Sequence, residues 1–153
     1  MKRSEMMIIS NLRNNARQSL TRMGRKTSIP ISTIYEKIRC YEEGIIKKYT
    51  VIVDFGKLGF ATRVSMLLKT TKEKRDELKN FLLENKSINN VYKINNEYDF
   101  VVEGFFRELK DVEAFLDKIE NSFGVSDKRL FYIVDDIKNE GFMSNPEAVM
   151  YDE

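Results

Sequence analysis

The sequence predicts an α+β protein of two modules: three short helices, followed by a domain with the element order β-α-β-β-α-β. Two observations on its 153 residues support this division. Apolar residues recur every three or four positions up to about residue 44, and alternate with polar residues in several later segments. Charge divides the chain as well, because residues 1–50 hold eleven Lys or Arg against four Asp or Glu, while the whole chain carries only +2. A basic block joined to an acidic one is typical of a module that faces a polyanion, although small domains also differ by several charges for no functional reason.

Composition narrows the class of protein. At 42% hydrophobic residues the chain can bury a core, and it contains no apolar run of the roughly 18 residues that cross a bilayer. Met1–Ile9 lacks the apolar core and cleavage site of a signal peptide, and Cys40 is the single cysteine. Histidine is absent, which removes the commonest general base and metal ligand. We therefore expect a cytoplasmic protein with no membrane partner, no metal, no cofactor and no catalytic residues.

Two short helices are predicted at the start of the chain. The first covers about residues 5–14, with Ile8, Ile9 and Leu12 on one face. The second covers about residues 18–26, with Leu20 and Met23 directed inward.

The third predicted helix runs from Pro30 to about Glu43. Its start has two candidates, because Pro30 suits a first helical turn, whereas Thr33 and Glu36 have the spacing of a capping box. Gly44 follows the helix, and we expect it to take a positive φ as glycines at helix ends do. The residues predicted to point inward are Ile31, Ile34, Ile38 and Tyr41.

From residue 45 the pattern favours strands. The β-branched stretch 45–55 predicts a linker strand. From residue 62 the order of elements is the split βαβ arrangement of a ferredoxin-like domain. Both helices of that arrangement cover one sheet face, so the other face should be buried, most simply by a second copy of the chain. The expected elements are a strand at 62–71, a helix at 72–86, two strands within 87–106, a helix at 108–123 and a strand at 127–137. A tight turn at Asn95–Asn96 is expected to join the two strands, and Gly124 to end the second helix. The residues that this second helix is expected to bury are Leu109, Val112, Leu116, Ile119 and Phe123.

These elements predict four segments. They are a helix-turn-helix domain at 1–49, a linker strand and hinge at 50–61, a ferredoxin-like dimerisation or effector domain at 62–137, and a tail at 138–153 whose weak periodicity predicts mobility.

The outer face of the third helix indicates a function. Once its inward residues are assigned, hydroxyls, a tyrosine, a carboxylate and two cations remain, and such side chains reach base edges and phosphates in the major groove of DNA. A helix, a turn and a second helix presenting this face predict a helix-turn-helix, although a polar face is also compatible with simple solvation. The residues predicted to contact DNA are Arg17, Ser32, Thr33, Tyr35, Glu36, Lys37 and Arg39. Other cations placed to meet phosphates are Arg13, Arg22, Arg25, Lys26, Lys47 and Lys48.

At these positions the sequence resembles a known family. "IISNLRNNAR" (Ile8–Arg17) resembles its first helix, and "STIYEKIRCYEEGIIKKYTVIVD" (Ser32–Asp54) resembles its recognition helix, Glu-Glu-Gly-Ile-Ile stop and following strand. "NNEYDF" (Asn95–Phe100) and "FGV" (Phe123–Val125) stand where the family has a turn before Tyr-Asp and a Gly-Val after the last helix. The family is that of the leucine-responsive/asparagine (Lrp/AsnC), or feast/famine, regulators. The resemblance spans about residues 5–137.

The resemblance implies a transcription regulator that binds double-stranded DNA, dimerises through its ferredoxin-like sheet, and assembles further, often into octamers. Many members bind an amino acid between dimers. In this chain the family's small residue of the second helix is Gly24, which close helix packing would justify, and the turn glycine beside the effector falls at Asn96. If this turn borders an amino-acid site, Asp99 would hold the effector's ammonium group and backbone amides of the turn would hold its carboxylate. The favoured alternative is a plain hairpin turn, in which Asn96 is present because it accepts a left-handed conformation. The effector-binding candidates are Asn95, Asn96, Glu97, Tyr98 and Asp99.

Two other functions remain open at this point. One is a ligand-binding or interaction module whose helix-turn-helix is vestigial, which the basic first block disfavours. The other is an enzyme, because some decarboxylase subunits of tetrapyrrole pathways resemble this family. Those subunits are expected to depend on histidine, which this chain lacks. Binding to duplex DNA separates these three functions.

Overall fold

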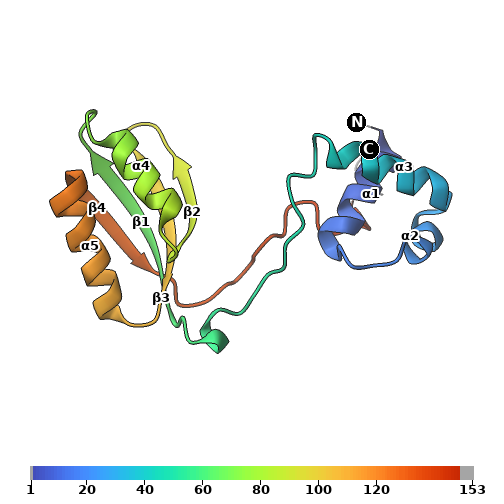
Figure 1. The fold of residues 1–153 in the computed structure, drawn as a ribbon. Coiled ribbons are helices and arrows are strands. Elements are labelled where there is room, and N and C mark those ends of the chain that lie inside the picture. Colours follow the sequence, from blue (N-terminus) through green and yellow to red (C-terminus); the bar gives the residue numbers. More distant parts are fainter. Residues whose placement is uncertain (1, 149–153) are drawn as a thin grey trace. The chain divides into compact units, whose positions relative to one another are not determined.

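The computed structural model describes residues 2–148, which fold as two compact units (Figure 1). Val53–Asp136 forms one unit, and the other combines the described residues up to Ile52 with those from Ile137 onward. The segment predicted as a separate tail at 138–153 is therefore part of the helical unit as far as residue 148, and residues 149–153 lie outside the described range. Among the described residues, helices long and apolar enough to cross a membrane are absent.

The helical unit consists of α1 (Arg3–Asn14), α2 (Leu20–Thr27) and α3 (Ile31–Glu42). Apolar residues of the three helices meet in one small core, and the predicted inward positions are confirmed for α1 and α2. In α3 the prediction is wrong for Ile31, whose side chain is 46% exposed. The buried core residues are Ile8, Met23, Ile34 and Tyr41, and those packed against them are Ile9, Leu12, Leu20, Ile29, Ile38 and Ile46.

The start of α3 agrees with one of its two predicted starts, whereas the end of α3 differs from the prediction. Pro30 is the N-cap residue, so the helix begins at Ile31 and the alternative start at Thr33 is excluded. Gly44 does not take a positive φ. Instead, the carbonyl oxygen of Tyr41 accepts hydrogen bonds from the amides of Gly44, Ile45 and Ile46 at 3.2, 2.8 and 2.7 Å, and this satisfies the end of the helix without a left-handed residue.

The C-terminal segment is attached to α1 chiefly by one arginine. The Arg13 guanidinium donates from Nη1 to Oε2 of Glu140 at 2.7 Å, from Nη2 to the Glu140 carbonyl at 3.1 Å, and from Nε to the Phe142 carbonyl at 3.1 Å. Asn14 adds a bond from Nδ2 to the Ser144 carbonyl at 3.0 Å. Glu140 and Met143 both have positive φ, at 51° and 54°, which is unfavourable for residues with side chains. These hydrogen bonds offset that cost and hold the segment in place.

The elements of the second unit are β1 (Thr62–Thr70), α4 (Arg75–Glu84), β2 (Ile88–Lys93), β3 (Phe100–Phe106), α5 (Leu109–Phe123) and β4 (Val125–Tyr132). The strands form an antiparallel sheet in the order β2-β3-β1-β4, as a ferredoxin-like domain requires. Helices α4 and α5 lie on the same face of the sheet (Figure 1). The predicted strand at 127–137 begins two residues earlier and ends at Tyr132, where its register with β1 ends opposite Val64. One further bond joins the Ile133 amide to the Arg63 carbonyl at 3.0 Å.

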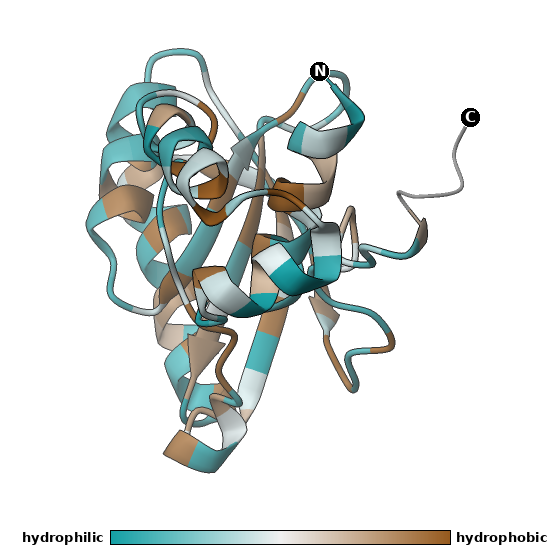
Figure 2. Cartoon of the chain, turned by 90° about the vertical axis from the view of Figure 1, so that its right-hand side faces the viewer, coloured by the Kyte–Doolittle hydropathy of each residue, from teal (hydrophilic) through white to brown (hydrophobic). Residues whose placement is uncertain are grey.

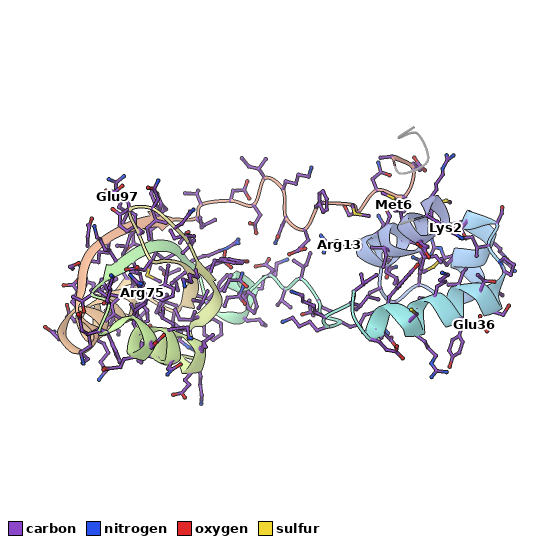
Figure 3. The ribbon with its side chains drawn as sticks, turned by 90° about the horizontal axis from the view of Figure 1, so that it is seen from above. Lys2, Met6, Arg13, Glu36, Arg75 and Glu97 are labelled. Atoms are coloured by element: carbon purple, nitrogen blue, oxygen red, sulfur yellow. The ribbon has the colours of Figure 1, made fainter. Side chains whose placement is uncertain are left out.

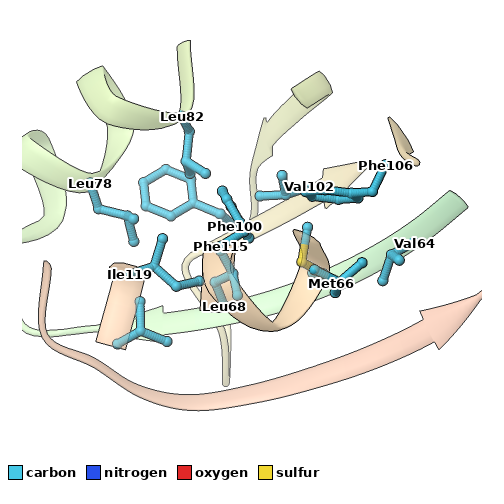
Figure 4. Close-up of a cluster of buried hydrophobic side chains, with 12 residues drawn as sticks. Val64, Met66, Leu68, Leu78, Leu82, Phe100, Val102, Phe106, Phe115 and Ile119 are labelled. Carbon is cyan, nitrogen blue, oxygen red and sulfur yellow. The ribbon is translucent and has the colours of Figure 1, made fainter. Parts of the chain in front are cut away.

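Strict alternation along β1 and β3 places one set of side chains in the core between the sheet and the helices (Figure 4). The helices carry both hydrophobic and hydrophilic residues, as their one-sided packing demands (Figure 2). Leu109, predicted to be inward, is instead 59% exposed because it is the first residue of α5, and Phe115 occupies the core. The buried core residues are Val64, Met66, Leu68, Leu78, Leu82, Phe100, Val102, Phe106, Val112, Phe115, Ile119 and Val125.

The predicted linker strand is not formed in the single chain. Within the described residues, positions 45–61 contain a short 3₁₀ helix at Gly56–Leu58 and are otherwise irregular. Val51 and Ile52 are 71% and 66% exposed. Strand propensity alone does not make a strand, because a strand exists only where a neighbour accepts and donates its backbone hydrogen bonds.

Replacing Arg13 with Gln should loosen the C-terminal segment. The three donors of Arg13 bind groups on a surface, so we expect a loss of about 1 kcal/mol of local stability and about fivefold faster cleavage by trypsin after Lys138. Site-resolved initial rates from mass spectrometry measure this. The control is Arg22→Gln, which removes the same charge from an exposed position on α2. Equal cleavage rates after Lys138 in both variants would contradict the attachment.

Candidate nucleic-acid interface and effector loop

Helices α2 and α3 are joined by a three-residue turn, Ser28–Pro30, in the manner of a helix-turn-helix. Ser28 takes a left-handed conformation, with φ 57°, as the C-cap of α2. Gly24 lies against the turn and the start of α3: a Cβ atom added there would lie 3.2 Å from the carbonyl oxygen of Ile29 and 3.3 Å from Cγ1 of Ile31. A side chain at this position would therefore require the turn or Ile31 to shift. The small residue in α2 is thus explained by packing.

The outer face of α3 carries most of the residues predicted to bind DNA. Ser32, Thr33, Tyr35, Glu36 and Arg39 are all exposed, and the structure brings them together on one helix within about two turns. Glu36 lies on the outer side of α3 (Figure 3). Hydroxyl, carboxylate and guanidinium groups presented together can donate to and accept from base edges.

Lys37 differs from its neighbours because it is engaged within the domain. Its Nζ lies 2.7 Å from Oε1 of Glu5 on α1, and its side chain is 42% exposed while that of Glu5 is 18% exposed. The hydrogen bond from Lys37 lowers the pKa of the Glu5 carboxyl and raises the pKa of the Lys37 ammonium. The pair joins α1 to α3, so Lys37 contributes less positive charge to the outer face than its sequence position suggested.

Some of the other cations of the helical unit are exposed, whereas others are bound within the unit as Lys37 is. Arg17 lies in the exposed turn between α1 and α2, and Arg22, Arg25 and Lys26 are exposed on α2. Arg13, by contrast, is occupied by the C-terminal segment. Lys47 and Lys48, which follow α3, are exposed as well. Exposed positive charge is therefore found on α2, on α3, in the turn that precedes α2 and after the end of α3.

The loop Ile94–Asp99 between β2 and β3 contains the effector candidates. It is a six-residue connection closed by a hydrogen bond from the Ile94 amide to the Asp99 carbonyl at 3.0 Å, rather than a two-residue tight turn. Asn96 has φ 87°, a left-handed conformation that Asn tolerates better than most residues. Asn95, Asn96 and Glu97 are exposed.

Tyr98 and Asp99, the last two candidates, point into the protein. The Asp99 carboxylate accepts from the Thr70 amide at 2.8 Å through Oδ2 and pairs with Nη2 of Arg75 at 2.6 Å through Oδ1. The Tyr98 hydroxyl donates to Oδ2 of Asp127 at 3.1 Å, and its ring is 6% exposed beneath Arg129. Burial and the hydrogen bond to Asp127 raise the pKa of Tyr98. Sequence reasoning missed these partners because they are distant along the chain.

Comparison with known proteins agrees with this architecture. The sequence profile of the Lrp/AsnC ligand binding domain matches residues 63–141. HTH-type transcriptional regulator FL11 of Pyrococcus horikoshii is 34% identical over 119 residues, which cover 77% of this chain and 79% of that protein. An uncharacterised HTH-type transcriptional regulator of Pyrococcus furiosus is 28% identical over 140 residues, or 91% of this chain and 94% of that protein.

Solved structures share the fold along most of the chain. LrpC of B. subtilis superposes with a TM-score of 0.81 at 24% identity, covering 90% of this chain and 97% of that chain. A transcriptional regulator of Neisseria meningitidis, solved as a complex with L-Met, superposes with a TM-score of 0.83 at 15% identity, covering 91% and 93%. The match of the ligand-binding domain and the identity to FL11 establish that this chain belongs to the Lrp/AsnC family of helix-turn-helix transcriptional regulators.

Proposed function

We propose that this chain is a cytoplasmic, non-enzymatic regulator that binds duplex DNA through the outer face of α3 and acts as a homodimer or a larger assembly. The observation that carries the proposal is the exposed polar face of α3, held by a helix-turn-helix in a block of the chain with eleven cations against four anions. A helix-turn-helix that no longer bound DNA would not require an exposed polar face and an excess of cations in the same module. The similar proteins of the genus Pyrococcus are regulators by name, which favours regulation over catalysis.

The proposed mode of binding places the start of α3 in the major groove. Residues near the start of a recognition helix contact base edges, which assigns Ser32, Thr33 and Glu36 to readout. Arg39, further along the helix, and Arg17, in the turn before α2, are assigned to phosphates, where a guanidinium makes bidentate contacts. Lys37 is a weaker candidate because its ammonium group is already paired with Glu5.

Dimerisation is proposed through the sheet face opposite α4 and α5. The pairing of β1 with β3 and β4 places Leu67 opposite Val101 on this face, and Ser65 opposite Phe131. Phe131 is 53% exposed and Tyr92 is 57% exposed, so an apolar area remains open to solvent in the single chain. A second copy would cover this area, and the two helix-turn-helix units of the dimer would then bind the two half-sites of one operator.

For the loop at 94–99 we propose a structural role for Asp99. Both of its carboxylate oxygens already have partners, so an ammonium group would have to compete with Arg75 and with the Thr70 amide. An amino-acid effector at this loop would instead meet Asn95, Asn96 and Glu97 together with backbone amides. The Neisseria regulator solved with L-Met makes amino acids the first class of ligand to test.

DNA binding is tested through its dependence on salt. Arg39→Gln and Arg17→Gln should weaken binding to all duplexes and reduce the slope of log K against log salt by about 0.9 for each phosphate that the variant no longer neutralises. Lys37→Gln should change the slope less, because Glu5 already neutralises Lys37. Lys86→Gln, which removes a charge from the sheet unit, is the control. Wild-type slopes in both arginine variants would remove this face from the interface.

Dimerisation is tested by placing a charge on the open sheet face. Phe131→Glu should convert the assembly to monomers at micromolar concentration, because an unpaired carboxylate would be buried between two copies. Light scattering of the full chain gives the mass. Leu109→Glu is a matched control, since Leu109 is similarly exposed but lies at the start of α5. If the wild type is itself a monomer, or if both variants keep its mass, the sheet is not the interface.

The role of Asp99 is tested by thermal unfolding. Asp99→Ala leaves the Thr70 amide without a partner and the Arg75 guanidinium without its carboxylate, so we expect a loss of about 1–3 kcal/mol. Glu97→Ala, at an exposed position two residues earlier, should stay within about 0.5 kcal/mol of wild type. The melting temperatures of the wild type and of both variants are then measured with and without each common amino acid. A stable Asp99→Ala variant that loses only an amino-acid response would contradict the structural role.

A further inference from the structure

The recognition helix carries two apolar side chains that the core does not use. Ile31 and Tyr35 are 46% and 52% exposed, and they stand four residues apart, so they are neighbours on one flank of α3. Ile38 on the same helix packs against the core of the unit, whereas Ile31 and Tyr35 are not among the residues described as packed there. This flank borders Ser32 and Glu36, the residues proposed to read bases.

Ile31 is held in place on its inner side. Its Cγ1 lies 3.3 Å from where a Cβ at Gly24 would stand, so it fills the space that the glycine leaves between α2 and α3. A β-branched side chain in a helix also has one strongly preferred rotamer. The exposed half of Ile31 is thus a methyl-bearing surface with little freedom, located at the first residue of α3.

We propose that Ile31, with Tyr35 beside it, contacts the C5-methyl group of a thymine in the major groove. Among the four bases, only thymine presents a methyl group there, and apolar side chains are its usual contacts. The first residues of a recognition helix are those that reach base edges. The inference rests on the proposed binding of DNA by α3, and it assigns to each half-site one thymine that is recognised by shape and apolar contact rather than by a hydrogen bond.

The experiment compares thymine with deoxyuridine, which lacks only that methyl group. In vitro selection with the wild-type chain first provides a bound duplex. Each thymine of one half-site is then replaced singly by deoxyuridine, and dissociation constants are measured for the wild type and for Ile31→Ala. We expect the wild type to bind about fourfold more weakly at one thymine, the effect of losing one buried methyl group. Ile31→Ala should bind the thymine duplex more weakly and show no further loss with deoxyuridine at that position.

Further variants separate recognition from damage to the fold. Ile31→Val keeps a β-branched side chain and should retain part of the discrimination. Cys40→Ala, also exposed on α3 but near its other end, should keep the wild-type profile. Wild-type binding that is indifferent to deoxyuridine at every thymine would overturn the inference, as would full discrimination by Ile31→Ala. In both cases DNA binding itself would stand, whereas failure to select any duplex would overturn the proposed function as well.

Discussion

The close approach of α2 to the start of α3 at Gly24 is the constraint on which the proposed DNA-binding surface depends. A Cβ at that position would meet a backbone carbonyl at 3.2 Å, and a carbonyl cannot move aside as the end of a flexible side chain can. This contact holds α2 against the turn that leads into α3, the helix that carries Ser32 and Glu36. Gly24 costs about 1 kcal/mol of helix propensity relative to alanine, and the closeness of the packing explains why the residue is nevertheless glycine.

Ion pairs inside the helical unit determine which of its many cations remain for a ligand. Arg13 is bound to Glu140, and Lys37 is bound to Glu5. Both pairs tie α1 to another segment, one to the C-terminal segment and one to α3. Other exposed cations are found on α2, on α3, in the turn before α2, and at Lys47 and Lys48 after α3. A count of cations from the sequence therefore overstates the number that could contact a ligand directly, because Arg13 and Lys37 already hold carboxylates.

The sequence predicted the fold well where a pattern is local. The spacing of apolar residues around Ile8 and Ile34 is a property of single helices, and the alternation along β1 is a property of one strand, so both could be predicted without the structure. The prediction of a linker strand failed because a strand needs a pairing partner, and the stretch has strand composition but pairs with no strand among the described residues. The partners of Asp99, which are Thr70 and Arg75, could not be predicted because they are distant in sequence. Periodicity also placed Ile31 inward, but Ile31 is the first residue of α3 and is 46% exposed.

The attachment of the C-terminal segment to α1 has a consequence for biosynthesis. The bond between Arg13 and Glu140 spans 127 positions, so the helical unit is built from segments at both ends of the chain. Domains usually fold as they emerge from the ribosome, N-terminal parts first. Here the three helices emerge first but obtain their last hydrogen bonds only after the whole sheet unit has been translated. A chain released before that point would contain α1, α2 and α3 without the hydrogen bonds that Arg13 and Asn14 make to the C-terminal segment.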